Sequence, residues 1–399
     1  FFGSGATSDT LTGPNGGAII TVSGANSGDV NGAFDFFNYE NLIAGSGNDT
    51  IAFTGSGTLS GTVNAGSGTD VLDYSAYSTG VNVNLHTSLV TVDTVNYNAR
   101  SATGIFSGAA NGISNFNNIV GSPLADVLIG DNSVNMITGG SGDDKLVGLG
   151  ANDAYLFGDN YGVDSIREIA LGGADDSLDF SAVGAGNALT VNIGSGTVNV
   201  SYGLNVATHT GDQVETIIGG QGDDRFKFVD AATFPGTLNG FSGAADTLDY
   251  SAYTTSVTVD LLAGTATGIV SESNIENIIG GLNDDSLTGD NNANIIDGGP
   301  GDDHLFGLDG DDTYEFGDDF GLDTVYENAA EGDDTMDFSA VTQPLTFTFN
   351  LTIVTVAYTS VPANTVTHTG IYVENYVGGG TGTSSSILDL SASLTGNNV

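Results

Sequence analysis

The sequence contains no cysteine among its 399 residues. This absence excludes a disulfide-stapled scaffold, and it excludes any zinc or iron–sulfur site that depends on thiolate ligands. It does not exclude secretion, because metal ions can stabilise an extracellular fold in place of disulfides. Proline is also scarce, with six residues, which excludes a collagen-like or proline-rich structure.

Basic residues are scarce as well. Five lysines and arginines stand against 49 acidic residues, which gives a formal net charge of −44. Phosphate binding requires a basic face, so we expect no nucleic-acid partner, and the same shortage excludes a polybasic membrane-surface patch. No apolar run approaches the roughly 18 residues that a spanning helix needs, so we also expect no membrane span.

The chain is nevertheless predicted to fold. Hydrophobic residues make up 39% of it, which is enough to bury a core. Charge of this size disfavours the compact state through self-repulsion, so we expect bound cations to supply the missing positive charge. The opening FFGSGATSDT has neither an initiating Met nor a basic segment, so we expect a processed chain or a piece of a longer protein.

Two blocks of the sequence repeat with a period of nine residues. Residues 121–156 read GSPLADVLI, GDNSVNMIT, GGSGDDKLV and GLGANDAYL, and residues 280–315 read GGLNDDSLT, GDNNANIID, GGPGDDHLF and GLDGDDTYE. Each unit has Gly at position one, Asp or Asn at position six, and a large apolar or aromatic residue at position eight. Isolated copies begin at Gly219 and, more weakly, at Ala44.

A longer period joins these blocks. The segment YENLIAG from Tyr39 recurs as VETIIGG from Val214 and as VENYVGG from Val373. We therefore predict two tandem modules with a partial copy at each end. The predicted boundaries are 1–38, 39–213, 214–372 and 373–399.

Apolar residues alternate with polar ones outside the nines, as in LTFTFNLTI from Leu345, and this alternation predicts β-strands. No stretch of ten residues has a capped helical period, so the expected fold class is all-β. A nine-residue unit cannot close a core alone, so the copies must stack and bury their position-eight side chains. Two units per turn would stack Asp126 with Asp144, Asn135 with Asp153, Asp285 with Asp303, and Asn294 with Asp312.

Stacked carboxylates repel one another unless a cation lies between them. Glycine-rich turns can direct carbonyl groups inward, and carbonyl plus carboxylate oxygens are the ligands that Ca²⁺ prefers, whereas Mg²⁺ demands tighter octahedral geometry. The units GGSGDDKLV, GGQGDDRFK and GGPGDDHLF resemble the GGxGxDxUx calcium-binding nonapeptide of the RTX (repeats-in-toxin) family. The resemblance implies a right-handed parallel β-roll, or β-solenoid, with calcium ions between turns, and bacterial export through a type I system.

The resemblance also implies that multiple Ca²⁺ ions are held by turn carbonyls and by the position-six side chains. Candidate ligands at position six, and at the equivalent acids of degenerate units, are Asp49, Asp70, Asp126, Asn135, Asp144, Asp153, Asp176, Asp224, Asp246, Asp285, Asn294, Asp303, Asp312 and Asp334. Candidate turn carbonyls belong to Gly121, Gly139, Gly142, Gly219, Gly222, Gly280, Gly298, Gly301 and Gly307. Sites built on the two asparagines are expected to be weaker.

A second set of acids lies inside five LDYSA-like segments. Asp73, Asp179, Asp249 and Asp337 are explained equally well as ligands or as turn caps that accept backbone N–H groups.

Other acids and two histidines raise the alternatives of a glycosidase active site and a zinc site, and the sequence favours a structural role over both. Adjacent pairs such as Asp143 and Asp144 resemble a glycosidase dyad, but neighbours that enter a strand point to opposite sides, which favours a structural role. His209 and His368 occupy equivalent THTG segments, which indicates a repeated structural role rather than a zinc site. The many Tyr and Phe residues are expected in the core rather than in a carbohydrate platform.

The sequence contains no HExxH, GxSxG, Walker or EF-hand motif, so we expect no enzymatic activity. We expect a secreted or cell-surface structural protein that folds on binding calcium and self-associates into a homopolymer, such as a surface layer, matrix, filament or adhesin stalk. One alternative is the carboxyl-terminal part of a secreted hydrolase or toxin. Another is an adhesin segment that binds a surface glycan through the non-repeat residues 77–113 or 339–370.

Overall fold

The computed structural model describes residues 1–4, 9–106, 112–168, 175–211, 213–328, 332–349, 353–358, 365–369 and 373–378. All regular structure within these residues is β-strand, which confirms the predicted fold class. No helix in the described ranges is long and apolar enough to cross a membrane. The chain forms two compact units: the first comprises Phe1–Gly184 and Asn199–Ile218, and the second comprises Ala185–Val198 and Gly219–Val399.

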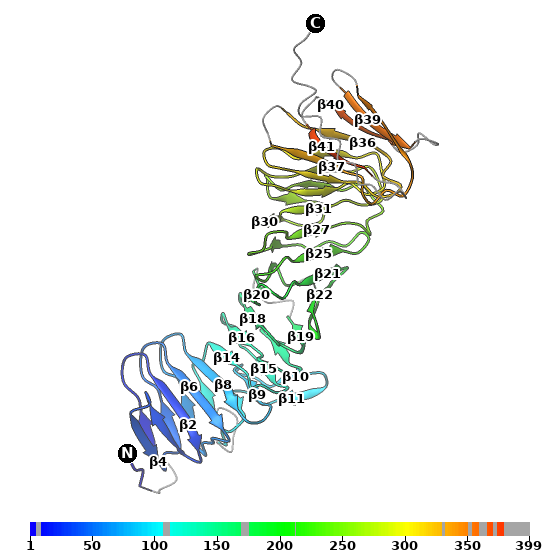
Figure 1. Ribbon diagram of the computed structural model, residues 1–399. Helices are drawn as coiled ribbons and strands as arrows, with labels where there is room; N and C mark the ends of the chain where they lie inside the picture. Colours follow the sequence, from blue (N-terminus) through cyan, green and yellow to red (C-terminus); the bar gives the residue numbers. More distant parts are fainter. Residues whose placement is uncertain are drawn as a thin grey trace. The chain divides into compact units, whose positions relative to one another are not determined.

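From β14 to β20 the chain of the first unit alternates between two sheets, adding one strand to each sheet per turn (Figure 1). One sheet contains, in stacking order, β4 (Phe34–Phe37), β3 (Ser27–Val30), β2 (Ile19–Gly24), β6 (Thr50–Gly55), β8 (Val71–Tyr77), β14 (Asn118–Val120), β16 (Met136–Thr138), β18 (Ala154–Gly158), β20 (Ser177–Ala182) and β24 (Thr216–Ile218). The other contains β12 (Ser101–Ala102), β9 (Asn82–Asn84), β15 (Val127–Ile129), β17 (Lys145–Val147), β19 (Val163–Arg167) and β23 (Asn205–Thr210).

The first unit also contains smaller pieces of sheet. A parallel four-stranded sheet comprises β1 (Thr10–Thr12), β5 (Asn41–Ile43), β7 (Val63–Asn64) and β13 (Ile113–Ser114). A hairpin comprises β10 (Val90–Val92) and β11 (Val95–Tyr97). The strand β22 (Thr197–Tyr202) contains one of the three points at which the chain passes from one unit to the other.

The second unit repeats the same alternation. One ladder contains β21 (Thr190–Gly194), β25 (Arg225–Phe228), β27 (Thr247–Asp249), β31 (Asn277–Ile279), β33 (Ile295–Asp297), β35 (Thr313–Glu315), β37 (Asp334–Asp337) and β41 (Val373–Val377). The other contains β29 (Thr265–Ala266), β28 (Thr258–Asp260), β32 (Ser286–Thr288), β34 (His304–Phe306), β36 (Leu322–Tyr326), β40 (Thr365–Thr369), β39 (Ile353–Tyr358) and β38 (Leu345–Phe349). A parallel pair comprises β26 (Thr237–Asn239) and β30 (Ser271–Ser273).

The core is built from the position-eight side chains. Leu128 pairs with Leu146 and Ile137 with Tyr155 in parallel register, and all four are fully buried. The equivalent side chains Leu287, Ile296, Leu305 and Tyr314 are also fully buried. The eighteen-residue stacking predicted from the repeat is therefore confirmed.

Aromatic rings extend the core at several turns. At these turns the residue two positions after position eight is aromatic, and its ring stacks on the equivalent ring of the next turn. Phe157 and Phe180 have ring centroids 4.4 Å apart, and Phe316 and Phe338 have centroids 4.6 Å apart. Such offset-stacked pairs add about 0.5–1.5 kcal/mol beyond burial, so the rings stabilise the stack along its axis.

Two sequence interpretations need correction. Residues 77–113 are not only an insertion, because β9 pairs in parallel with β15 and adds a turn to the stack. LTFTFNLTI does not form a single strand either, because β38 ends at Phe349 and Ile353 begins β39, which runs antiparallel to β38. In both places, local alternation predicts strand but says nothing about its partner.

Candidate metal centre

The position-six residues form two columns in each unit, on the turns that precede the strands. Most backbone N–H groups in a column donate to the side-chain oxygen of the residue one turn further on, whereas those of Asn117, Glu215 and Glu276 donate to the backbone carbonyl of the column residue one turn before. Asp126 N donates to Asp144 Oδ1 at 2.8 Å, and Asp285 N donates to Asp303 Oδ1 at 2.8 Å. At the start of the strands, each of these side-chain oxygens therefore takes the place of a backbone carbonyl as the hydrogen-bond acceptor between neighbouring strands.

The predicted residues and their stacked neighbours account for these columns. The first unit contains one column of Asp49, Asp70, Asn117, Asn135, Asp153, Asp176 and Glu215, and a second of Asp126, Asp144 and Asp164. The second unit contains one column of Asp224, Asp246, Glu276, Asn294, Asp312 and Asp334, and a second of Asp285, Asp303 and Asp323.

In most column aspartates the second carboxylate oxygen, Oδ2, is buried and accepts no hydrogen bond. This applies to Asp49, Asp70, Asp144, Asp153, Asp164, Asp176, Asp246, Asp303 and Asp312. A buried carboxylate oxygen without a donor is costly, and the shortage of lysine and arginine leaves no internal counter-charge for so many. A hard cation with oxygen preference fits this donor set.

Glycine at position one has no side chain, and the Oδ2 atom of the position-six aspartate occupies the space that a Cβ atom would need. A Cβ atom placed on Gly139 would lie 2.3 Å from Asp144 Oδ2, and one on Gly298 would lie 2.5 Å from Asp303 Oδ2. The position-four residues Gly142 and Gly301 have φ angles of 125° and 159°, which side chains with a Cβ rarely adopt. The same close approach recurs at Gly121, Gly219, Gly280 and Gly307, whereas Gly222 lies instead against the backbone of the preceding turn.

Not every predicted ligand presents a free oxygen. Asn135 Oδ1 accepts from Asp131 N, and its amide Nδ2 donates to Asn117 O at 2.7 Å. Asn294 makes the equivalent bonds to Asp290 N and Glu276 O. The oxygen and nitrogen of both side-chain amides are thus hydrogen-bonded to neighbouring backbone groups, in keeping with the expectation that calcium sites built on these asparagines are weaker.

Three of the four aspartates that begin a column, namely Asp126, Asp224 and Asp285, accept hydrogen bonds at both carboxylate oxygens, whereas the fourth, Asp49, does not. Both carboxylate oxygens of Asp126 accept hydrogen bonds, from Val81 N on one side and from Ser122 on the other. Asp224 and Asp285 accept backbone N–H groups at both oxygens in the same way. Their role as calcium ligands stays a prediction.

Several members of the columns do not follow the nine-residue count. Asp164 and Asp323 were missed because they follow Asp144 and Asp303 by 20 residues rather than 18. One signal would have found them: every column residue lies two positions before a buried hydrophobe, as Asp164 does before Ile166. The same rule finds Glu215 and Glu276.

Burial dominates the electrostatics of the columns. It raises the pKa of Asp144 to about 7 and that of Asp303 to about 8, because desolvation outweighs the hydrogen bonds from backbone N–H groups and neighbouring acids raise the pKa further. For Asp323, the same causes raise the pKa to about 9. Without a cation, these buried groups therefore favour the protonated form near neutral pH.

The LDYSA-like acids are turn caps. Asp73, Asp179, Asp249 and Asp337 each accept the backbone N–H of the serine two residues later.

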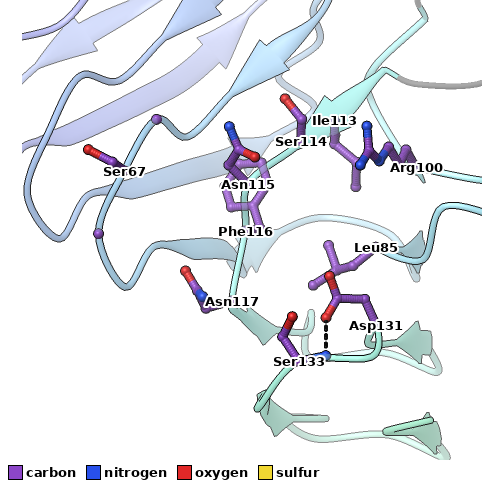
Figure 2. Close-up of a pocket in the computed structure, with 12 residues that line it drawn as sticks. Ser67, Leu85, Arg100, Ile113, Ser114, Asn115, Phe116, Asn117, Asp131 and Ser133 are labelled. Atoms are coloured by element: carbon purple, nitrogen blue, oxygen red, sulfur yellow. Dashed lines mark hydrogen bonds between the residues drawn. The ribbon is translucent and has the colours of Figure 1, made fainter. Parts of the chain in front are cut away.

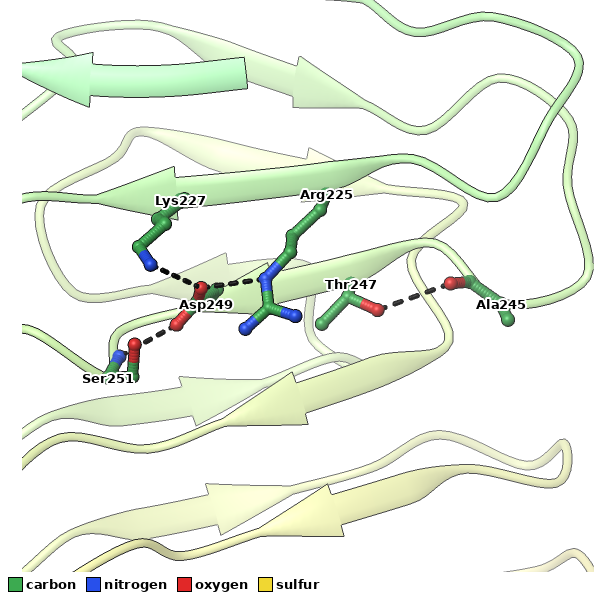
Figure 3. A network of polar contacts seen from close by, with 6 residues as sticks. All are labelled: Arg225, Lys227, Ala245, Thr247, Asp249 and Ser251. Carbon is green, nitrogen blue, oxygen red and sulfur yellow. Dashed lines mark hydrogen bonds and ion pairs between the residues drawn. The ribbon is translucent and has the colours of Figure 1, made fainter. Parts of the chain in front are cut away.

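Asp249 has protein counter-charges as well. Arg225 Nε lies 2.7 Å from its Oδ2 and Lys227 Nζ lies 3.7 Å away (Figure 3). Burial acts to raise the pKa of Asp249, but Ser251 and the Arg225 guanidinium outweigh burial and hold the pKa below its usual value.

The adjacent acids do not form dyads. Asp143 is exposed and accepts Val163 N, whereas Asp144 is buried. His209 and His368 are both buried in the core, and burial lowers the pKa of His368 to about 4. Their equivalent positions, opposite Ile166 and Val325, are in keeping with the repeated structural role expected for them.

A polar cleft of about 300 Å³ lies in the first unit, beside the columns. Its lining includes Leu85, Arg100 and Ile113 from residues 77–113, together with Asn115 and Ser133 (Figure 2). Asp131 at its edge accepts the backbone N–H of Ser133 at 2.7 Å. That residues 77–113 carry a ligand-binding face stays a prediction, and this cleft is the candidate position for it.

Comparison with known proteins agrees with the geometry of the columns. The profile of the RTX calcium-binding nonapeptide repeat, in four copies, matches residues 120–155, 209–227 and 279–314. These three segments therefore match the RTX calcium-binding nonapeptide repeat, and the stacked parallel strands that contain them form a β-roll.

Among solved structures, the extracellular lipase LipA from Serratia marcescens is 18% identical to this chain, with a TM-score of 0.20. The match covers 62% of this chain and 38% of the lipase chain. No curated protein matches the sequence.

Proposed function

We propose that this chain is an extracellular structural protein whose folding is coupled to calcium and whose folded units associate with other copies. The observation that carries the proposal is the set of buried aspartate oxygens that accept no hydrogen bond, repeated turn after turn. Calcium at these positions supplies folding free energy that grows with occupancy. In a calcium-poor cytoplasm the same acids repel one another and keep the chain unfolded, which suits export.

The absence of catalytic motifs from the sequence supports a structural role rather than an enzymatic one. The columns are distributed along both units instead of converging on one pocket, which also suits a structural element. A catalytic domain in a longer protein would favour the alternative of a secreted hydrolase or toxin, and the full gene would reveal it.

Association between copies is supported at the amino-terminal end of the first unit. β4 lies at the edge of its sheet, and its Phe34 and Phe37 are 58% and 41% exposed. The ring of Phe2, itself 80% exposed, stacks on Phe37 with centroids 5.2 Å apart. Residues 1–3 hydrogen-bond to this edge through Phe37, so the feature left open is a cluster of exposed phenylalanine rings, and an exposed apolar cluster of this kind favours contact with another chain.

We expect calcium to convert the protein into oligomers or filaments visible by electron microscopy and light scattering, and EGTA to disperse them. Changing Phe34 and Phe37 together to Ser should reduce assembly at least about tenfold while leaving the circular dichroism spectrum in calcium unchanged. The matched control is Leu204→Ser, which alters a side chain that is 92% exposed away from this edge. A strictly monomeric protein in saturating calcium would contradict the assembly part of the proposal.

A further inference from the structure

A third buried carboxylate joins one column in each unit. Glu168 comes directly after β19 and Glu327 directly after β36, and each is only 5% exposed. The Tyr155 hydroxyl donates a hydrogen bond to Glu168 Oε1, and the Tyr314 hydroxyl donates one to Glu327 Oε1. Because each tyrosine is itself a fully buried position-eight residue, the two glutamates are held at a fixed depth in the turn.

These glutamates meet two stacked aspartates. Asp153, Glu168 and Asp176 each place one oxygen within 4.8 Å of the other two, and Asp312, Glu327 and Asp334 form the same group in the second unit. Two successive turns and the segment after the neighbouring strand thus converge on one point. The arrangement occurs twice, at equivalent places in the long repeat.

Unused oxygens face this point. Asp153 and Asp312 are each 1% exposed, and each accepts a backbone N–H at Oδ1 while its Oδ2 accepts none. A Cβ atom on Gly148 would lie 2.2 Å from Asp153 Oδ2 and 2.4 Å from Glu168 Oε1, so the aspartate oxygen and the glutamate oxygen that accepts the Tyr155 hydroxyl border the same space. Glu327 Oε2 is also buried without a donor.

The other columns lack this feature. Among the described residues, only these two groups bring three acidic side chains to one point. The column of Asp285, Asp303 and Asp323 offers stacked aspartates alone. The two glutamate-containing groups therefore differ from the other column positions by a third carboxylate.

We propose that each unit contains one glutamate-closed calcium site, in which three carboxylates chelate Ca²⁺ through side-chain oxygens. The inference rests on the proposed function, in that it takes the columns to be calcium-binding. Each of the three carboxylates places one oxygen at this point, and backbone carbonyls or water can complete the flexible shell of six to eight oxygens that Ca²⁺ takes, which suits Ca²⁺ better than the strict octahedron of Mg²⁺. Affinity in oxygen sites rises with ligand charge, so these two sites are the tightest in the chain and the last to lose their ions. Tyr155 and Tyr314 are positioning residues that orient the glutamates.

The test uses the full chain. Calcium is counted by native mass spectrometry and by equilibrium dialysis of ⁴⁵Ca, for the wild type and for the double variant Glu168→Gln with Glu327→Gln. We expect the wild type to hold two ions about 100-fold more tightly than the remainder, and the double variant to lose this tight class while still folding at higher calcium. The control is Asp302→Asn, which removes one exposed acid and should retain both tight ions.

The tyrosines provide a second readout. Tb³⁺ replaces Ca²⁺ at oxygen sites and emits when a nearby phenol is excited, and here the phenols are hydrogen-bonded to the proposed ligands. Tyr155→Phe with Tyr314→Phe should therefore reduce the emission from the first two bound Tb³⁺ ions at least about threefold without reducing the number of ions bound. If the glutamine variant does not fold at any calcium concentration, the Tb³⁺ emission of this tyrosine variant tests the glutamate-closed sites in its place.

The outcomes separate the two proposals. If the wild type binds no calcium, the proposed function fails and this inference fails with it. If calcium binds and folds the chain but the glutamine variant keeps both tight ions, or the phenylalanine variant keeps full emission, only the glutamate-closed sites are overturned. Equal affinity of all sites in the wild type would overturn them as well.

Discussion

Replacing Asp303 with Ala is expected to raise the calcium concentration at the folding midpoint at least about tenfold, which corresponds to 1.4 kcal/mol or more. Asp303 is fully buried, and its Oδ1 accepts the N–H of Asp285 while its Oδ2 has no donor. The alanine leaves that N–H buried without an acceptor, which costs about 1–3 kcal/mol, and it removes a charge from the cation site. Far-ultraviolet circular dichroism during a calcium titration measures the midpoint.

Two matched variants separate the loss of the hydrogen-bond acceptor from the loss of the charge. Asp303→Asn keeps an amide oxygen for Asp285 N but removes the charge, so it should behave nearly as the alanine does if the carboxylate holds calcium. Asp302→Ala changes the neighbouring exposed acid, which accepts only Leu322 N at 3.1 Å, and should shift the midpoint less than about twofold. An asparagine variant that folds at the wild-type midpoint would show that Asp303 acts through its hydrogen bond alone.

The calcium-free protein is expected to gain β-structure as the pH falls from 8 to about 5. Burial raises the pKa of Asp153 to about 8, that of Asp246 to about 7 and that of Asp312 to about 7, from a usual value of 3.8. Between the usual and the raised values the folded state binds more protons than the unfolded state, so the free energy of unfolding decreases as the pH rises. The contribution of these groups is fully present below pH 4 and is lost as the pH passes through about 6 to 8.

Calcium should reverse this dependence. The ligands must be deprotonated to bind a metal ion, so the midpoint calcium concentration is expected to fall as the pH rises from 5 to 8. Circular dichroism in EGTA and in 5–10 mM calcium, at constant ionic strength, measures both trends. A calcium-free spectrum that is more ordered at pH 8 than at pH 5 would show that the column carboxylates are not buried as described.

The repeat made the core and most of the columns predictable. A strict nine-residue period fixes which residues are eighteen apart, and two strands per turn then place Asp126 beside Asp144 and Asn135 beside Asp153. The hydrophobe at position eight follows from the same arithmetic, which is why Leu146 and Leu305 are buried where expected.

The nine-residue count no longer locates the column residues where the turn length changes. Two extra residues separate Asp144 from Asp164, so the position-six count no longer locates the next ligand, although the spacing to Ile166 still does. Glu168 was beyond prediction for another reason. It reaches its column from the end of a strand in the opposite sheet, and no periodicity records that approach. The module boundaries predicted from the long period stay a prediction.

A calcium titration of the full chain at pH 7.5, followed by far-ultraviolet circular dichroism, tests the coupling of calcium to folding most directly. In EGTA the unpartnered carboxylates of both units should keep most of the chain unfolded, and calcium in the millimolar range should restore the β-spectrum cooperatively. Magnesium at the same concentration should restore little of it. A β-spectrum at full strength in EGTA would contradict the account.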